Sequence, residues 1–120
     1  MEGLVKGDVV VLPFPFSDLS ANKRRPAVVV TKGEYGDVIL CQITSKAPTN
    51  RRLRHQSASG TETVELRDKD FQEGKLKITS YVRQRKIFTA DLGLILYRAG
   101  RIKKEKMRDV EDALCRIIKE

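Results

Sequence analysis

The sequence is poor in the residues that build metal sites, disulfides and membrane spans. Its 120 residues include no tryptophan, one histidine and two cysteines. Cys41 and Cys115 form no CxxC motif and have no histidine at metal-ligand spacing, so we expect two small buried thiols and no disulfide or metal. No apolar run approaches the ~20 residues of a membrane span, and the first residues are too charged for a signal peptide. We therefore expect a single soluble, cytoplasmic domain over residues 1–120.

Positive charge is the most prominent property that remains. Lys and Arg number 24 against 16 Asp and Glu, which gives a net charge of +8. Such an excess serves either solubility alone or a polyanionic partner, which would be nucleic acid more readily than a membrane surface. Lys23, Arg24 and Arg25 stand directly before Pro26 and an apolar run. Cations beside a buried strand cost stability unless an anion uses them, so the sequence predicts an anionic partner at this point.

Apolar runs predict five or six strands. Continuous runs such as VVVLPF and PAVVV indicate strands that are buried on both faces or bent around a barrel. The glycines of KGEYG predict a turn, and we expect another turn at FQEG, residues 71–74. The segment LGLILYR, residues 92–98, is either a short strand or the entry to the helix. The strands are expected at Asp8 to about Phe14 and at residues 26–31, 37–44, 61–68 and 76–90.

The C-terminal segment, residues 103–120, is the clearest helix of the chain. Its apolar residues recur at steps of three and four and form one stripe: Met107, Val110, Leu114, Ile117 and Ile118. We expect this stripe to pack on the core or on a second copy. The fold class predicted is mainly β (α+β), a small antiparallel barrel capped by a C-terminal helix.

Two polar loops interrupt the strands. The first covers Ser17 to Arg25, and the second covers Ser45 to Gly60 and is rich in basic residues. Loops as long as the second are usually functional or disordered.

Three separated motifs, in order, carry a family resemblance. GDVVVLPFPFSDLSANKRRPAVVV, VILCQITSK and GKLKITSYVRQRKIFTADLG, followed by the amphipathic helix, resemble the MazF/PemK toxins of bacterial type II toxin–antitoxin systems. The resemblance implies an SH3-like barrel with a C-terminal helix, and a homodimer. It also implies a metal-independent endoribonuclease that cuts single-stranded mRNA and is silenced by an acidic antitoxin. The toxin–antitoxin complex would bind operator DNA.

The resemblance also assigns site residues. It implies that Arg25, immediately before the proline, is catalytic and that Thr44 is its partner. Arg83 matches an arginine that contributes in some members, but Arg85 stands where those members have an acid. A guanidinium suits this chemistry, because it pairs with two phosphate oxygens while the 2′-OH of RNA attacks the phosphorus. The products would be a 2′,3′-cyclic phosphate and a 5′-OH. Asp18 and His55 could accept a proton, and the base stays open.

Further residues are expected to contact RNA without a metal or cofactor. Most are cations that attract phosphates, and Phe16 could stack on a base. Together they are Phe16, Asp18, Lys23, Arg24, Ser45, Arg51, Arg52, Arg54, His55, Arg83 and Arg85.

Two other functions remain open at this point. The same barrel in the CcdB proteins poisons DNA gyrase, so the fold does not determine the target. A member that binds nucleic acid without cutting it is the other alternative, and the departure at Arg85 keeps it open.

Overall fold

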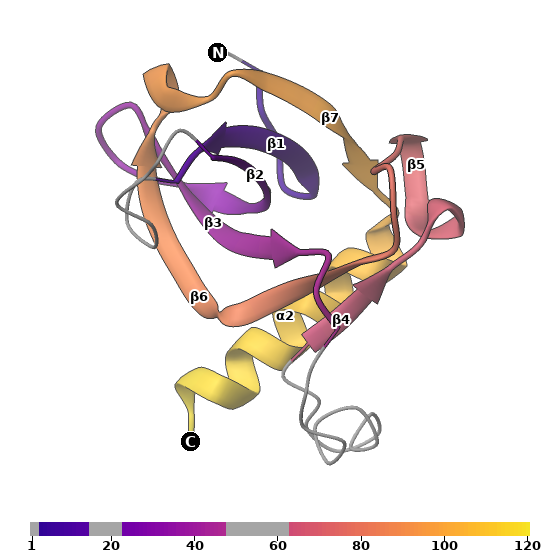
Figure 1. Ribbon diagram of the computed structural model, residues 1–120. Coiled ribbons are helices and arrows are strands. Elements are labelled where there is room, and N and C mark those ends of the chain that lie inside the picture. Colours follow the sequence, from indigo (N-terminus) through magenta and orange to yellow (C-terminus); the bar gives the residue numbers. More distant parts are fainter. Residues whose placement is uncertain (1–2, 15–22, 48–62) are drawn as a thin grey trace.

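The computed structural model describes residues 3–14, 23–47 and 63–120, and in this part of the chain seven strands precede one helix, α2 (Figure 1). The helix covers Lys104–Ile118, and no helix of the described residues is long and apolar enough to cross a membrane. The strands are β1 Asp8–Pro13, β2 Arg24–Lys32, β3 Asp37–Thr44, β4 Thr63–Leu66, β5 Phe71–Gly74, β6 Ser80–Asp91 and β7 Tyr97–Ile102.

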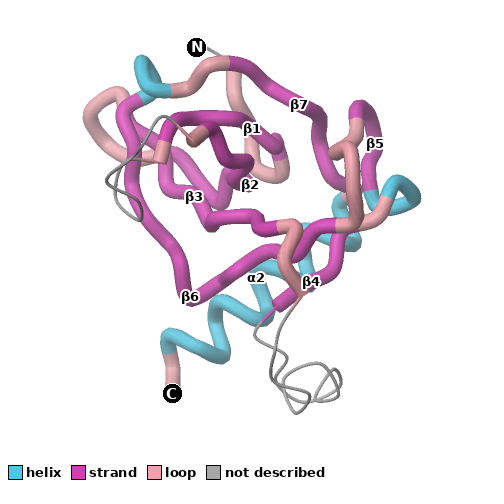
Figure 2. Tube along the Cα trace, viewed as in Figure 1, coloured by secondary structure: helices cyan, strands magenta, loops and turns pink. Residues whose placement is uncertain are grey.

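The seven strands form one sheet in the order β4-β6-β3-β2-β1-β7-β5, and every pairing is antiparallel. The edge strands β4 and β5 are joined by a single 3₁₀ turn, Asp68–Asp70. The sheet therefore curls into a nearly closed barrel, and α2 lies across its lower side beside β4 and β6 (Figures 1 and 2). The predicted fold class, a small antiparallel barrel with a C-terminal helix, is confirmed.

The central strands are buried on both faces, which explains their continuous apolar runs. Val28 belongs to a core cluster that includes Met107, Val110 and Leu114 of α2. Its neighbours Ala27 and Val29 belong to a second cluster, which Phe14 and other residues complete. Each fully buried valine side chain contributes about 1.5–3 kcal/mol. These contacts hold β2 in place between two packed layers.

Strand β6 bends where its pairing with β3 changes. Cys41 pairs with Ile87, but the next residue, Gln42, pairs with Arg83, so Gln84, Arg85 and Lys86 are extra residues on β6. Extra residues of this kind bend a strand and re-aim its side chains. The corner of β6 in Figure 1 lets one strand pair with both β3 and β4.

Three sequence predictions need correction. FQEG is not a turn but strand β5, which pairs with β7. The segment 92–98 contains a 3₁₀ turn, Leu92–Leu94, and then begins a full strand, β7. Ile118 is 72% exposed in the single chain, so its contact with a second copy stays a prediction. Cys115 is exposed as well, whereas Cys41 is buried as expected; Cys115 does not share the helix face that carries Val110 and Leu114.

A fully buried carboxylate, Asp8, fastens the start of β1. It accepts hydrogen bonds from the Val5 backbone amide (2.8 Å) and from Arg101 Nε (2.8 Å), and it lies 3.4 Å from Arg98 Nη1. The pKa of Arg101 is raised by its hydrogen bond and charge interaction with Asp8. A buried charge is tolerated only when it is paired and hydrogen-bonded in this way.

We predict that Asp8→Ala lowers the free energy of unfolding by about 3 kcal/mol, since it removes one anionic partner from each of two arginines and the acceptor of one amide. Urea denaturation measures the change. Asp109→Ala, an exposed carboxylate of α2, is the matched control and should lie within about 0.5 kcal/mol of the parent. Equal losses for the two variants would contradict the role assigned to Asp8.

The two thiols should differ in reactivity. Burial raises the pKa of Cys41 to about 12, so at about pH 8 its thiol stays protonated and unreactive. We predict that iodoacetamide labels Cys115 in the folded protein and labels Cys41 only after denaturation, as read by peptide mass spectrometry. Labelling of Cys41 at the rate of Cys115 without denaturant would contradict the burial described.

Candidate functional site

The strand register brings Arg25 and Thr44 together. Ala27 pairs with Gln42 and Val28 with Cys41 across β2 and β3. Continuing this register by two residues sets Arg25 directly across from Thr44, and residues opposite each other in an antiparallel pair share one face of the sheet. Arg25 is also paired with Leu12 of β1. The two residues taken as catalytic therefore lie on the same face at neighbouring ends of β2 and β3, two residues beyond the last β2–β3 pair.

Arg25 is held at its base by the core. It alternates with Ala27 and Val29 on the face of the second cluster, beside Leu12. The side chain is half-buried, and its Nε is shielded from solvent and has no hydrogen-bond acceptor among the described residues. A buried donor without an acceptor costs about 1–3 kcal/mol. The geometry is therefore one that an added oxygen acceptor would stabilise.

Thr44 has its hydroxyl oxygen fixed by the backbone. Thr44 Oγ1 accepts a hydrogen bond from the Lys46 amide at 3.1 Å, the local turn that serine and threonine favour at strand ends. Because the hydroxyl accepts this bond, its proton remains available for donation to a second oxygen. Thr44 can therefore serve as a hydrogen-bond donor to a ligand held by Arg25.

The same row continues onto β6 and β4 through residues that sequence reasoning missed. Thr44 pairs with Tyr81, and Tyr81 pairs with Glu65. The row thus runs from a guanidinium through a hydroxyl and a phenol to a carboxylate. Glu65 also accepts a hydrogen bond from Arg67 Nε. The alternation of Tyr81 with Arg83 was visible in the sequence, but the pairing across three strands was not.

A second row of paired residues on the same face lies two residues further along the strands. Gln42 pairs with Arg83, and Arg83 pairs with Thr63 on β4. Arg83 is exposed and Gln42 is buried. Arg83 therefore shares the face of Arg25 and Thr44, as a cation contacting the same ligand must.

Other sequence-predicted residues flank this face. Lys23 and Arg24 are exposed at the start of β2, where Arg24 pairs with Pro13 and the Lys23 carbonyl accepts from the Phe14 amide at 3.0 Å. Ser45 is exposed directly after Thr44. These residues border the Arg25–Thr44 pair along the chain.

Arg85 does not lie in either of these two rows of paired residues. It lies among the extra residues of the β6 bend, and Arg85 Nη2 forms an ion pair with Glu120 Oε1 at 2.5 Å, just beyond the end of α2. Arg85, where the resemblance implied an acid in some members, thus binds the C-terminal end of the helix.

The remaining predicted contacts lie outside the described residues. These are Phe16 and Asp18 in the first loop and Arg51, Arg52, Arg54 and His55 in the second. Within residues 3–14, 23–47 and 63–120, no three His, Cys, Asp or Glu side chains are grouped as metal ligands would be.

Solved structures share this architecture. A mycobacterial endoribonuclease in complex with its cognate antitoxin is 17% identical, with a TM-score of 0.69 over 98% of this chain and 96% of that one. A MazE–MazF structure from Deinococcus radiodurans gives 18% identity and a TM-score of 0.70 over 97% and 96%. The Mycobacterium tuberculosis toxin MazF-mt6 gives 14% and 0.66 over 93% and 96%. At these identities the likeness establishes the fold.

The sequence comparisons are more selective. No curated protein matched the chain. The sequence profile of the PemK-like, MazF-like toxins of type II toxin–antitoxin systems matches residues 5–118, which is nearly the whole chain. The match runs from β1 to α2 and includes β2, which carries Arg25. It therefore covers every described element of the site. The chain therefore belongs to the PemK-like, MazF-like toxin family of type II toxin–antitoxin systems.

Proposed function

We propose that this toxin is an endoribonuclease that cuts single-stranded RNA without a metal ion, with Arg25 and Thr44 as its catalytic residues. One observation carries the proposal. Arg25 Nε is shielded from solvent without an acceptor among the described residues, beside a threonine whose hydroxyl is positioned to donate. A phosphodiester supplies the oxygens that this pair lacks. The structures of similar fold that are described as endoribonucleases support the same activity.

The reaction follows from the chemistry of RNA and from these two side chains. The 2′-OH loses its proton and attacks the adjacent phosphorus, and the bond to the 5′ oxygen breaks. A 2′,3′-cyclic phosphate and a 5′-OH result. Arg25 stabilises the charge that accumulates on the phosphoryl oxygens, because the planar, positively charged fork of a guanidinium binds two oxygens. Thr44 donates a hydrogen bond to the same group.

Groups other than Arg25 and Thr44 must accept and donate the protons in this reaction. The 2′ proton needs an acceptor and the leaving oxygen a donor, and guanidinium is a poor acceptor because its pKa lies above ~12. The row places one phenol, Tyr81, and one carboxylate, Glu65, on the same face. Asp18 and His55 stay candidates as well. With Arg85 turned to Glu120, the reaction proposed here uses no acid from the β6 position that some relatives employ.

The partners proposed follow from the family and its neighbours. Similar structures are described in complex with an antitoxin or with MazE, and we propose an acidic antitoxin for this toxin too. A homodimer and operator DNA bound through the toxin–antitoxin complex complete the proposal, in the bacterial cytoplasm. The excess of eight positive charges suits both an acidic partner and RNA.

The test is cleavage of a long single-stranded RNA in the presence of EDTA, followed by sequencing of the RNA ends. We expect discrete cuts with 5′-OH ends, and a loss of at least about 100-fold in rate for Arg25→Ala, the usual effect of removing a group that stabilises transition-state charge. Arg116→Ala, which removes an exposed cation from α2, is the control and should leave the rate unchanged.

Two further variants separate charge from geometry. Arg25→Lys keeps the charge but loses the fork, so its rate should fall between those of the parent and of Arg25→Ala. Thr44→Val should slow cleavage about tenfold and Thr44→Ser much less, because only the serine keeps the hydroxyl. Full activity of Arg25→Ala, or cleavage only with added Mg²⁺, would overturn the proposal. Binding of RNA without any cut would identify a non-catalytic member instead.

A further inference from the structure

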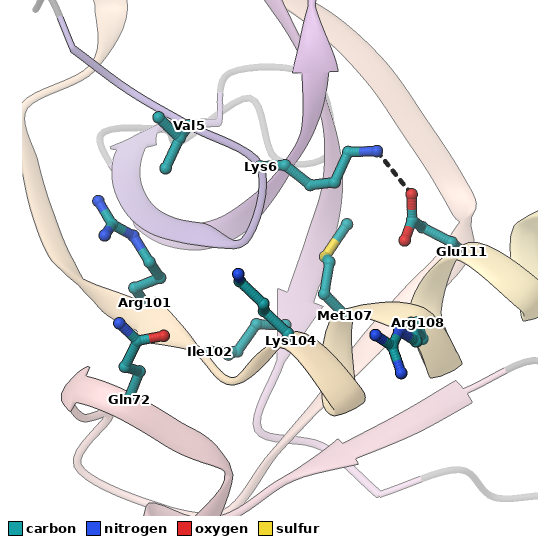
Figure 3. Close-up of a pocket in the computed structure, with 9 residues that line it drawn as sticks. All are labelled: Val5, Lys6, Gln72, Arg101, Ile102, Lys104, Met107, Arg108 and Glu111. Atoms are coloured by element: carbon teal, nitrogen blue, oxygen red, sulfur yellow. Dashed lines mark hydrogen bonds and ion pairs between the residues drawn. The ribbon is translucent and has the colours of Figure 1, made fainter.

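A second basic site lies on another part of the barrel. A cavity of about 360 Å³ opens between the turn before β1, the end of β7 and the start of α2 (Figure 3). The Gly7 amide donates to the Val29 carbonyl at 2.9 Å, so this turn lies beside β2 four residues from Arg25, roughly 13 Å along the strand. The cavity residues Ile102 and Met107 belong to the cluster under α2, on the sheet face opposite Arg25.

The cavity combines an apolar floor with a cationic rim. Val5, Ile102 and Met107 supply the apolar surface. Four cations surround it, of which Lys6 is paired with Glu111 at 2.6 Å.

Arg101 is a second cation of the rim with an anionic partner, because its Nε binds Asp8 at 2.8 Å. Lys104 and Arg108 have no ion-pair partner among the described residues. In Figure 3 the Lys104 amine extends into the open space between Arg101 and Lys6.

The position of the two unpaired cations costs stability in the free protein. Lys104 and Arg108 are four residues apart on α2, where like charges repel each other, and Lys104 opposes the helix dipole in the first turn, which Glu105 complements. The N-cap residue, Lys103, gives the first turn no side-chain hydrogen bond. An anion bound in the cavity would reduce the repulsion between Lys104 and Arg108 and would compensate for the missing N-cap hydrogen bond.

The residues that line the cavity favour one class of anion over others. The residues around the cavity include no aromatic side chain, and single-stranded RNA is held by stacking on such rings. A free phosphate needs neither the apolar floor nor the neutral amide of Gln72. A peptide uses every part of the lining: its aliphatic side chain covers the floor, its amide groups pair with Gln72, and its carboxylates reach the cations.

We propose that this cavity binds an acidic peptide segment of a partner protein, with one aliphatic side chain over Met107 and flanking carboxylates on Lys104 and Arg108. The site is separate from the Arg25 face. It does not depend on RNA cleavage, so failure of the cleavage test leaves it standing.

Fluorescence anisotropy with labelled peptides tests the proposal on the full chain. The probe is the acidic peptide EDELDE, and the comparison peptides are EDESDE, which lacks the leucine, and QNQLNQ, which lacks the charges. We expect EDELDE to bind most tightly. The double variant Lys104→Ala/Arg108→Ala should weaken it about tenfold, because two charge-assisted contacts are lost.

The matched control is Arg116→Ala/Lys119→Ala, which removes the same charge from exposed positions near the other end of α2 and should leave the affinity unchanged. Val5 is 43% exposed, so Val5→Ser should not disturb folding. This variant should reduce the difference in affinity between EDELDE and EDESDE. Equal weakening by the two double variants would overturn the proposal, as would equal binding of EDELDE and EDESDE. So would a single-stranded RNA oligonucleotide that loses more affinity than EDELDE on Lys104→Ala/Arg108→Ala.

Discussion

The pairing of β2 with β1 and β3 is the constraint on which the rest of this structure depends. It buries Val28 against the helix side and Ala27 and Val29 against the other core, so β2 can neither slide nor twist without exposing apolar surface on both faces. A slip by one residue would exchange the two faces. The same register carries Arg25 to a position across from Thr44. Packing of apolar side chains thereby positions a polar pair that could not hold itself in place.

Charge in this small domain falls into two kinds. Asp8 is fully buried and satisfied by Arg101 and the Val5 amide, and it serves the fold. Arg25 Nε, Lys104 and Arg108 lack such partners within the described residues, and the last two line an open cavity. The contrast separates cations that stabilise the barrel from cations that are available to bind a ligand. The net charge of the chain does not distinguish these two kinds.

Local patterns were enough to predict the architecture, whereas the roles of Arg25 and Thr44 came from the family resemblance and stay predictions. The valine runs, the stripe of α2 and the proline after Arg25 predicted a helix-capped barrel with a cation at a strand end. FQEG read as a turn because two of its four residues are polar and one is glycine, whereas pairing with β7 makes it a strand. The places of Tyr81 and Glu65 beside Thr44 depend on the register of β6, and the bend that sets it involves three extra residues with no local signal.

The most direct test concerns the Nε–H group of Arg25. Nitrogen-15 NMR of the arginine side chains, with Arg25→Lys to assign the signal, can follow it in the free toxin and with a 2′-O-methylated single-stranded RNA that carries a sequenced cut site and cannot react. We expect the Arg25 Nε–H signal to exchange slowly with water in the free protein, and to shift on RNA binding as a phosphate oxygen becomes its acceptor. An Arg25 signal that stays in place while other arginines shift would contradict this expectation.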